Sequence, residues 1–204
     1  MSMQTGATER SPVERAPRRN GRPPKSSLRV PTTDRLLSAA TDVFVEHGFG
    51  GATVTEIARR AGISGPAAYK HFDTKADLLV AAAKRGLRET TSGVGAAGPH
   101  EIARRWMSPE FASTRRLMVE LHLAAGRESE VFDLLSAWHH DQSSGWVDRR
   151  GDSPEQVKAF FLLLLGLAQL DALSSLPADD VELGRGVDRM IDALFDAGSM
   201  SSDG

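Results

Sequence analysis

The chain of 204 residues contains no cysteine, which excludes disulfide frameworks, cysteine-based zinc sites and thiol nucleophiles. Its longest apolar run lies within residues 159–170 and is shorter than the about 20 residues that a membrane span needs. Residues 1–30 are polar and arginine-rich, without the apolar stretch of a secretory signal. These absences predict a soluble, cytoplasmic protein with no membrane partner.

Charge is distributed unevenly, although the net charge is only −2. Residues 1–75 contain 12 Lys and Arg against 7 Asp and Glu, whereas residues 76–204 contain 13 against 20. A basic N-terminal third on an acidic body indicates that the first part of the chain meets a polyanion such as nucleic acid. Chance clustering of charge is the alternative that this imbalance leaves open.

Beyond the first 30 residues, which hold too few large aliphatic side chains to fold alone, apolar residues recur at helical spacing. Gly or Pro marks the end of most periodic stretches, and no strand alternation or internal repeat is visible. This pattern predicts an all-α protein of about nine helices. The predicted helices span residues 32–47, 100–106, 109–125, 128–147, 154–174 and 180–197, with three more beginning after Thr53, Ser64 and Thr74.

Residues 53–72 form the most specific pattern in the sequence. Thr53 and Glu56 fit a capping box, Gly62 ends the short helix that they begin, and Ser64 can cap the next helix. Two short capped helices that meet at a glycine-containing turn are typical of a helix-turn-helix, whose second helix enters the major groove of DNA. The residues expected to hold the two helices together are Ala58, Ile63, Ala68 and Phe72.

The stretch TVTEIARRAGISGPAAYKHFDTKADLL resembles the DNA-binding signature of the tetracycline-repressor (TetR) family, together with the preceding F-x-x-x-G-F. The resemblance covers residues 33–80, and the rest agrees only in length and helical pattern. It implies a DNA-binding domain over residues 31–76 and a helical effector-binding and dimerisation domain over residues 77–204, with residues 1–30 as a disordered basic arm. The implied function is ligand-relieved repression at a palindromic operator bound by a homodimer.

The resemblance also implies which residues contact DNA. They are Thr53, Thr55, Ser64, Gly65, Pro66, Tyr69, Lys70, His71 and Lys75. Tyr69 and His71 match phosphate contacts of the family, and Lys75 matches a lysine that holds the DNA backbone. For each, an ordinary packed or solvated side chain is the alternative. Ala68 stands where the family usually has Leu or Ile, which puts the packing beneath the recognition helix in doubt.

Residues 18–25 form a second predicted DNA contact. Their Gly-Arg-Pro resembles the core of an AT-hook, in which arginine enters a narrow minor groove and proline keeps the chain extended. Asn20 stands where that motif has arginine. A tail attracted only by charge is the alternative. The expected contacts are Arg18, Arg19, Arg22 and Lys25.

Residues 154–174 are apolar on nearly every side of their predicted helix, so this helix must be covered all round. A core covers one side, and the resemblance implies that a partner subunit covers the other, in a four-helix bundle with residues 180–197. A central helix of a monomer is the alternative. The expected interface residues are Phe160, Phe161, Leu164, Leu167 and Leu194.

The resemblance further implies a pocket for an apolar small-molecule effector. Aromatic and methionine side chains at helical spacing are also typical of an ordinary core, which is the alternative for each residue. The expected lining residues are Trp106, Met107, Phe111, Met118, His122, Phe132, Trp138 and Trp146.

Two other functions stay open. An architectural DNA-binding protein would use the motif and the tail without an effector. A small helical enzyme would use His122, His139 and His140, but adjacent residues on a helix point about 100° apart and share a ligand sphere poorly. The sequence has no Gly-rich phosphate loop, H-E-x-x-H or nucleophile elbow. We therefore expect no catalytic residue, cofactor or metal.

Overall fold

A computed structural model describes residues 30–92, 98–174 and 180–196 of the chain. Within these ranges the protein is all-α, with nine α-helices, one 3₁₀ turn and no strand, as the sequence predicted. The arm contacts predicted at Arg18, Arg19, Arg22 and Lys25 lie outside the described residues. The helices are α1 (Thr32–Gly51), α2 (Val54–Arg60), α3 (Gly65–Ala68), α4 (Lys75–Thr91), α5 (Pro99–Met107), α6 (Ala112–Ala125), α7 (Ser129–Arg150), α8 (Pro154–Ser174) and α9 (Val181–Asp196), and the 3₁₀ turn is η1 (Pro109–Phe111).

Two glycines set the boundaries of the first helices. Gly48 has φ 67° and ψ 172°, so the regular part of α1 ends before it and a short turn leads to Ala52. Gly62 has φ 68° and separates α2 from α3. Glycine adopts this left-handed region without the steric penalty of a side chain, which explains both helix ends.

The helix starts follow the capping pattern with one correction. Thr53 accepts a hydrogen bond from the backbone of Glu56 at 3.2 Å, but the Glu56 carboxylate binds Arg59 and Arg60 instead of reaching back. The predicted box at the start of α2 is therefore only half formed, because two nearby guanidiniums are stronger partners. A complete capping box begins α4, between Thr74 and Asp77.

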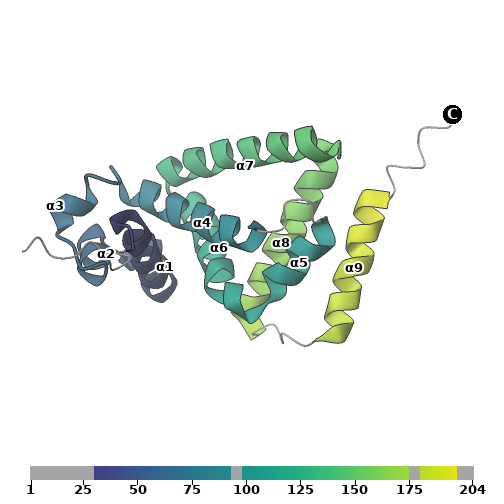
Figure 1. Ribbon diagram of the computed structural model, residues 1–204, viewed down its shortest axis with the longest axis horizontal. Coiled ribbons are helices and arrows are strands. Elements are labelled where there is room, and N and C mark those ends of the chain that lie inside the picture. The colour runs from purple at the N-terminus through teal and green to yellow at the C-terminus, as the bar shows by residue number, and fades with distance from the viewer. Residues whose placement is uncertain (1–29, 93–97, 175–179, 197–204) are drawn as a thin grey trace, which may run out of the picture.

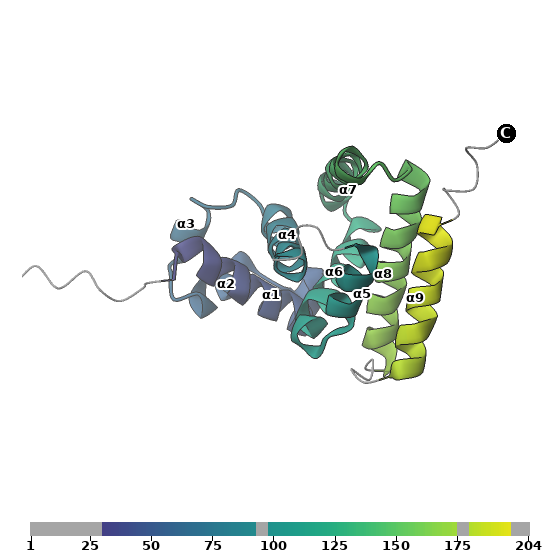
Figure 2. The ribbon, with the colours of Figure 1, turned by 45° about the vertical axis from the view of Figure 1, so that its right-hand side comes forward.

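Helix α6 is the central element of the described chain, since it packs against α1, α4, α7 and α8. Helices α1 to α3 form one end of the molecule and α9 lies at the opposite end (Figure 1). Helices α8 and α9 run side by side on the far side of α6 (Figure 2). The helix-turn-helix segment is thus exposed at one end, and α6 connects it with the body.

A buried ion pair joins the helices of the body. Arg115 on α6 is 1% exposed, and its Nε donates to Asp171 on α8 at 3.1 Å. The same guanidinium donates to the carbonyls of Trp106 and Ser108. The indole of Trp106 donates in turn to the carbonyl of Leu164 at 2.8 Å. These bonds fix the end of α5 and the start of α6 against α8.

The structure corrects three of the five residues predicted for the dimer interface. Phe160 is 0% exposed, and Leu164 and Leu167 are each 5% exposed, so these side chains face the interior of their own protomer. Phe161 and Leu194 are half-buried, and their place in an interface stays a prediction. Because α8 is apolar all round, periodicity did not distinguish its inner face from its outer face.

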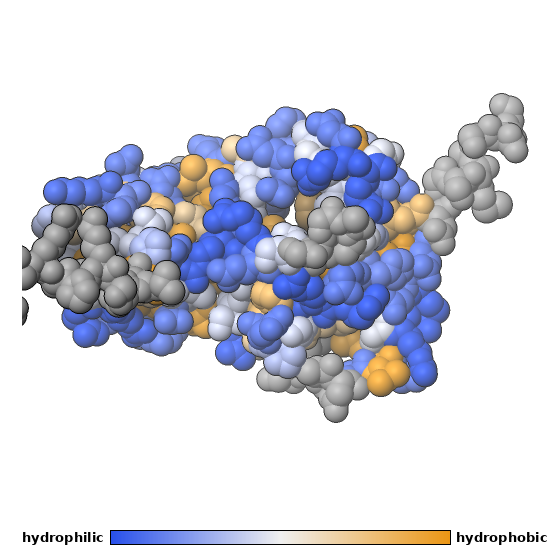
Figure 3. All heavy atoms as spheres, viewed as in Figure 1, coloured by the Kyte–Doolittle hydropathy of each residue, from blue (hydrophilic) through white to orange (hydrophobic). Residues whose placement is uncertain are grey.

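Other apolar side chains reach the surface of α8 and α9. Leu162, Leu173 and Met190 are 69%, 84% and 56% exposed. In the space-filling view, apolar atoms appear between hydrophilic ones, including at the end of the molecule that carries α9 (Figure 3). Large apolar side chains exposed in this way are candidates for a protein–protein contact.

One helix among the described residues, at 154–173, is long and apolar enough to cross a membrane, with a mean hydropathy of 1.5. The core helix of a soluble protein passes the same test, and this helix packs against α5, α6, α7 and α9. Length and composition are therefore weak evidence for a membrane span.

Removal of the buried guanidinium of Arg115 tests how much its ion pair with Asp171 and its hydrogen bonds stabilise the body. We expect Arg115→Met to lower the free energy of unfolding by about 3–5 kcal/mol, because it leaves a buried carboxylate without this cation. Urea unfolding followed by circular dichroism measures the change. The exposed neighbour Arg116 provides the control, since Arg116→Met should change the free energy by less than about 0.5 kcal/mol. Equal effects of the two substitutions would contradict this account of Arg115.

Candidate nucleic-acid interface and cavity

The predicted DNA contacts of the helix-turn-helix lie at the exposed end of the molecule. Their side chains are exposed except for Gly65 and Lys75, which are half-buried. Tyr69 is 52% exposed at the end of α3, and Ser64 caps α3 by accepting from the backbone of Ala67 at 3.4 Å. Thr55 lies beside Gly65, because a Cβ at Gly65 would come within 3.9 Å of its Oγ1. The exposed residues are Thr53, Thr55, Ser64, Pro66, Tyr69, Lys70 and His71.

The packing beneath α3 is tight despite the small residue at position 68. Ala68 is 1% exposed and Ala58 is fully buried, so the two short helices meet through small side chains. Ile63 and Phe72 pack against the same core. The alanine therefore allows a close approach of α2 and α3 and leaves no exposed gap at this position.

Lys75 makes contacts within the fold that the sequence did not predict. Its Nζ donates to the carbonyl of Phe49 at 2.6 Å and to that of Ala52 at 3.2 Å, and it lies 4.2 Å from the centre of the Phe49 ring. The half-buried ammonium is therefore hydrogen-bonded within the fold, and its predicted contact with the DNA backbone stays a prediction. Its contacts close the turn formed by residues 48–52.

Glu120 on α6 holds the same turn from the other side. Its Oε1 accepts a hydrogen bond from the backbone N–H of Phe49 at 2.5 Å. A Cβ at Gly48 would approach this carboxylate oxygen to 3.2 Å, so the contact is close. The turn after α1 is thus bonded to α4 through Lys75 and to α6 through Glu120. Sequence reasoning did not identify Glu120, because the contact joins residues 71 apart in the chain.

The two arginines of α2 are neutralised on the protein itself. Arg59 and Arg60 both donate to Glu56, and Arg60 also donates to Glu46 at 2.6 Å. These hydrogen bonds lower the pKa of Glu56 to about 2, with Arg59 making the larger contribution. The positive charge that remains available on α3 is that of the exposed Lys70, which has no ion-pair partner among the described residues.

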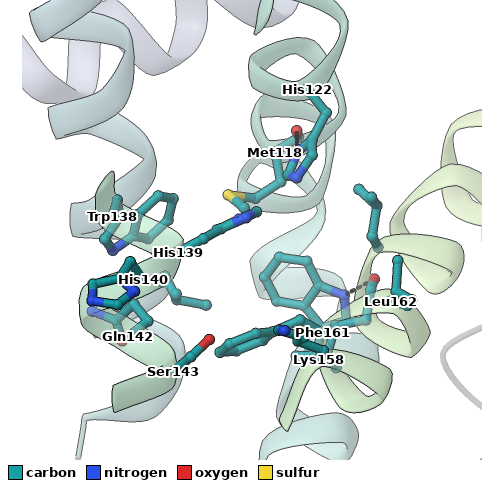
Figure 4. A pocket seen from close by; sticks show the side chains of 14 residues that line it. Met118, His122, Trp138, His139, His140, Gln142, Ser143, Lys158, Phe161 and Leu162 are labelled. Atoms are coloured by element: carbon teal, nitrogen blue, oxygen red, sulfur yellow. Dashed lines mark hydrogen bonds between the residues drawn. The ribbon is translucent and has the colours of Figure 1, made fainter. Parts of the chain in front are cut away.

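A cavity of about 570 Å³ lies in the body, walled by residues of α4, α5, α6, α7 and α8. This volume is typical of a small-molecule site. Figure 4 shows residues of α6, α7 and α8 pointing toward a common space. The lining residues are Leu87, Trp106, Met118, His122, Trp138, His139, His140, Gln142, Ser143, Lys158, Phe161, Leu162, Leu164 and Leu165.

The wall contains Trp106, Met118, His122 and Trp138 from the predicted effector site, and their role in binding stays a prediction. The other predicted lining residues lie outside the wall. Phe132 is 57% exposed, and Phe111 packs beneath the guanidinium of Arg105. Trp146 contacts Phe160 and Phe161 and donates to Asp152, while Met107 packs against the core. Helical spacing placed them on the correct helices but on other faces.

Two histidines that are 17 positions apart meet across α6 and α7. The ring centres of His122 and His139 lie 5.4 Å apart, and His139 is also 6.3 Å from Phe161. Burial, and secondarily the charge of His122, lowers the pKa of His139. The sequence did not predict this contact, because it depends on the packing of α6 against α7. The described residues contain no group of three or more His, Asp or Glu side chains positioned for a metal.

Comparison with known proteins finds sequence similarity in the N-terminal part of the chain. Residues 36–82 match the family model described as bacterial regulatory proteins, tetR family. The HTH-type transcriptional activator FasR of Mycolicibacterium smegmatis is 42% identical over 77 residues. That match covers 38% of this chain and 33% of FasR, so the chain spans about a third of the length of this relative.

The solved structures show that the likeness of the fold extends over the body. Salmonella enterica GusR superposes with a TM-score of 0.67 at 20% identity, covering 85% of this chain and all of that one. The multidrug binding protein EbrR complexed with ethidium superposes with a TM-score of 0.59 at 23% identity, covering 80% of this chain and 98% of that one.

A matched pair of lysines tests the hydrogen bonds of Lys75 to the 48–52 turn. We expect Lys75→Met to lower the free energy of unfolding by about 1–3 kcal/mol, because two carbonyls lose a charged donor. Lys70→Met should leave it within about 0.5 kcal/mol, because Lys70 is exposed. Chemical denaturation of both variants measures the difference. An unchanged stability of Lys75→Met would show that the bonds to the 48–52 turn contribute nothing.

The buried histidine predicts a pH dependence of stability. With its pKa lowered on folding, His139 stays neutral in the folded chain at a pH where the unfolded chain takes up a proton. Its contribution is present above the unfolded-state pKa of about 6.5 and is lost as the pH falls through the lower folded-state pKa. We therefore expect His139→Gln to lose less stability than the wild type between about pH 7 and about pH 5.

Denaturation midpoints at the two pH values measure this effect. The control is His140→Gln, which changes the exposed neighbour and should preserve the wild-type acid sensitivity. The same acid loss in the wild type and in His139→Gln would contradict the prediction.

Proposed function

Because the chain belongs to the tetR family of bacterial regulatory proteins, we propose that it is a sequence-specific, ligand-relieved transcriptional repressor. The observation that carries this proposal is the family match over residues 36–82, whose α3 segment exposes Ser64, Tyr69 and Lys70 at one end of the molecule. In the proposal, residues 31–76 bind the operator and residues 77–204 bind an effector and the partner subunit.

The proposed reading of DNA combines phosphate contacts with DNA shape. Residues 65–68, Gly-Pro-Ala-Ala, offer almost no hydrogen-bonding side chains to base edges. Thr55, Tyr69, Lys70 and His71 supply the hydroxyl, amine and imidazole groups that bind phosphates or bases. The basic arm with Arg18, Arg19, Arg22 and Lys25 adds minor-groove contacts in this proposal.

A homodimer is proposed, because a single helix-turn-helix buries little surface, and paired half-sites of a palindromic operator match a two-fold axis. The exposed apolar residues Leu173 on α8 and Met190 on α9 support an interface there. In the proposal this interface replaces the buried Phe160, Leu164 and Leu167 first expected. The protein acts on DNA and is therefore placed in the cytoplasm.

A small-molecule effector is proposed for the cavity of about 570 Å³. EbrR, which has a similar fold, is a multidrug binding protein seen with ethidium. The cavity weighs against an architectural protein without an effector. The curated relatives, such as FasR, are described as transcriptional regulators, which favours regulation over the enzyme reading.

The structure supports a route from cavity to DNA. Met118 and His122 line the cavity on α6, and Glu120 of the same helix bonds the turn between α1 and α2. A helix that shifts when the cavity is filled therefore pulls on the base of the helix-turn-helix. In the proposal this shift changes the spacing of the two recognition helices and releases the operator.

Binding to the protein's own upstream region tests the proposed function. We expect the full chain to bind this DNA as a dimer with a steep dependence on salt, because Lys and Arg contacts release counterions from phosphates. Fluorescence anisotropy at several salt concentrations measures affinity and slope. A chain without residues 1–30 should bind with a smaller slope. Absence of binding to the upstream region at low salt would overturn the proposal.

Glu120→Gln tests the proposed link between α6, which lines the cavity, and the turn at residues 48–52. Loss of a negative charge near DNA would by charge alone strengthen binding. We expect the opposite, a DNA affinity about tenfold weaker, because Phe49 loses a charge-assisted bond and the turn loosens. Glu110→Gln removes an exposed acid on η1 and serves as the control. Equal or higher DNA affinity of Glu120→Gln relative to that control would contradict the link.

A further inference from the structure

The charged side chains of the cavity wall all have one sign. Apart from the polar but uncharged Gln142 and Ser143, its remaining surface is apolar or aromatic, from Leu87, Met118, Phe161 and other residues. No aspartate or glutamate belongs to this wall. The side chains that carry or can take up a positive charge are Lys158, His122, His139 and His140.

Lys158 is the fixed charge of this group. It lies on α8 one turn before Phe161 and Leu162, so all three share a face of the helix that borders the cavity. Figure 4 shows Lys158 next to Phe161 at the cavity. Within the described residues its ammonium has no ion-pair partner, and its side chain is exposed where it borders the cavity. A cation beside an apolar wall favours an anion that reaches it from inside the cavity.

The opposite wall supplies further donors. His139 and His140 project from α7, and Figure 4 shows Ser143 and Gln142 on the same helix. The imidazole, hydroxyl and amide groups can donate hydrogen bonds to a carboxylate held between α7 and α8. Met118, Trp106 and Leu165 form the apolar part that would cover the rest of the molecule.

We infer that the effector is an amphipathic carboxylate, with one anionic head between Lys158 and the α7 donors and an apolar body along α6 and α8. This inference rests on the proposed function and specifies the ligand class of the same cavity. A cationic amphiphile finds no acidic partner in this wall, and a neutral one gains no ion pair with the exposed Lys158.

Binding of an anion in the cavity should become tighter as the pH falls. The groups that face the site are His122 from α6, His139 and His140 from α7, and Lys158 from α8. Lys84 of α4 lies 5.9 Å from the Trp138 ring on the adjoining side, where Asp141 borders a neighbouring groove. Burial lowers the pKa of His139, and a bound anion favours its protonated form, so the anion binds more tightly as the pH falls through that pKa.

Three probes of equal chain length separate the charge of the head from the apolar body: decanoate, decan-1-ol and decyltrimethylammonium. Titration of the full chain, followed by tryptophan fluorescence and calorimetry, measures each affinity, since Trp106 and Trp138 lie in the wall. We expect decanoate to bind about tenfold more tightly than decan-1-ol, because it gains a charge-assisted bond. Decyltrimethylammonium should bind most weakly.

Variants assign the preference to Lys158. Lys158→Met should remove the tenfold preference for decanoate over decan-1-ol, and Lys158→Arg should retain it. Arg116→Met removes one exposed charge outside the cavity and should leave the preference unchanged. Equal binding of all three probes, tighter binding of the cation, no binding of decanoate, or a preference that survives Lys158→Met would overturn the inference.

Binding to the upstream DNA is measured on the same preparation without any probe. If DNA binds and decanoate does not, the ligand class is wrong and DNA-binding regulation stands. If decanoate binds with the expected preference and DNA does not, the ligand class stands and the regulatory proposal fails.

Discussion

The structure depends on the turn at residues 48–52, which is held by opposite charges from two different helices. Glu120 of α6 accepts from the Phe49 N–H, and Lys75 of α4 donates to the carbonyls of Phe49 and Ala52. Gly48 at φ 67° brings the chain close enough for both bonds. The position of the helix-turn-helix relative to the body is therefore tied to α4 and α6 by a few strong polar contacts.

Helix α6, which carries Glu120, also forms part of the cavity wall. Met118 and His122 lie on either side of Glu120 in sequence, one turn or less away, and both line the cavity. Arg115 joins the same helix to α8 through a buried ion pair and to the carbonyls at the end of α5. In the proposed mechanism, a ligand that displaces α6 also displaces the turn before α2, because Glu120 of α6 is bonded to that turn.

Local patterns predicted the parts of the fold that local chemistry decides. Gly48, Gly62 and the capping residues Ser64 and Thr74 act over a few residues, and the helices begin and end close to where these residues predicted. The contacts of Lys75 could not be predicted, because the family signature names the residue and not its partner in the fold.

The faces of the body helices were the least predictable feature. Helix α8 is apolar on nearly every side, so Phe160 and Leu164 looked equally suited to an interface and to a core, and they are buried in the protomer. His122 and His139 meet only because α6 and α7 pack together, a tertiary fact that no local spacing contains. The cavity wall could not be predicted for the same reason, since its residues come from five helices that meet only in the folded chain.

Hydrogen exchange on a cavity-filling variant tests the central claim, that occupancy of the cavity reaches the DNA-binding end through α6. Leu165→Trp adds bulk to the wall without requiring a known ligand. Compared with the wild type, the account predicts altered protection in α6 and at residues 48–52, where Phe49 donates to Glu120. Changes confined to α5, α7 and α8, with the 48–52 turn unaffected, would contradict it.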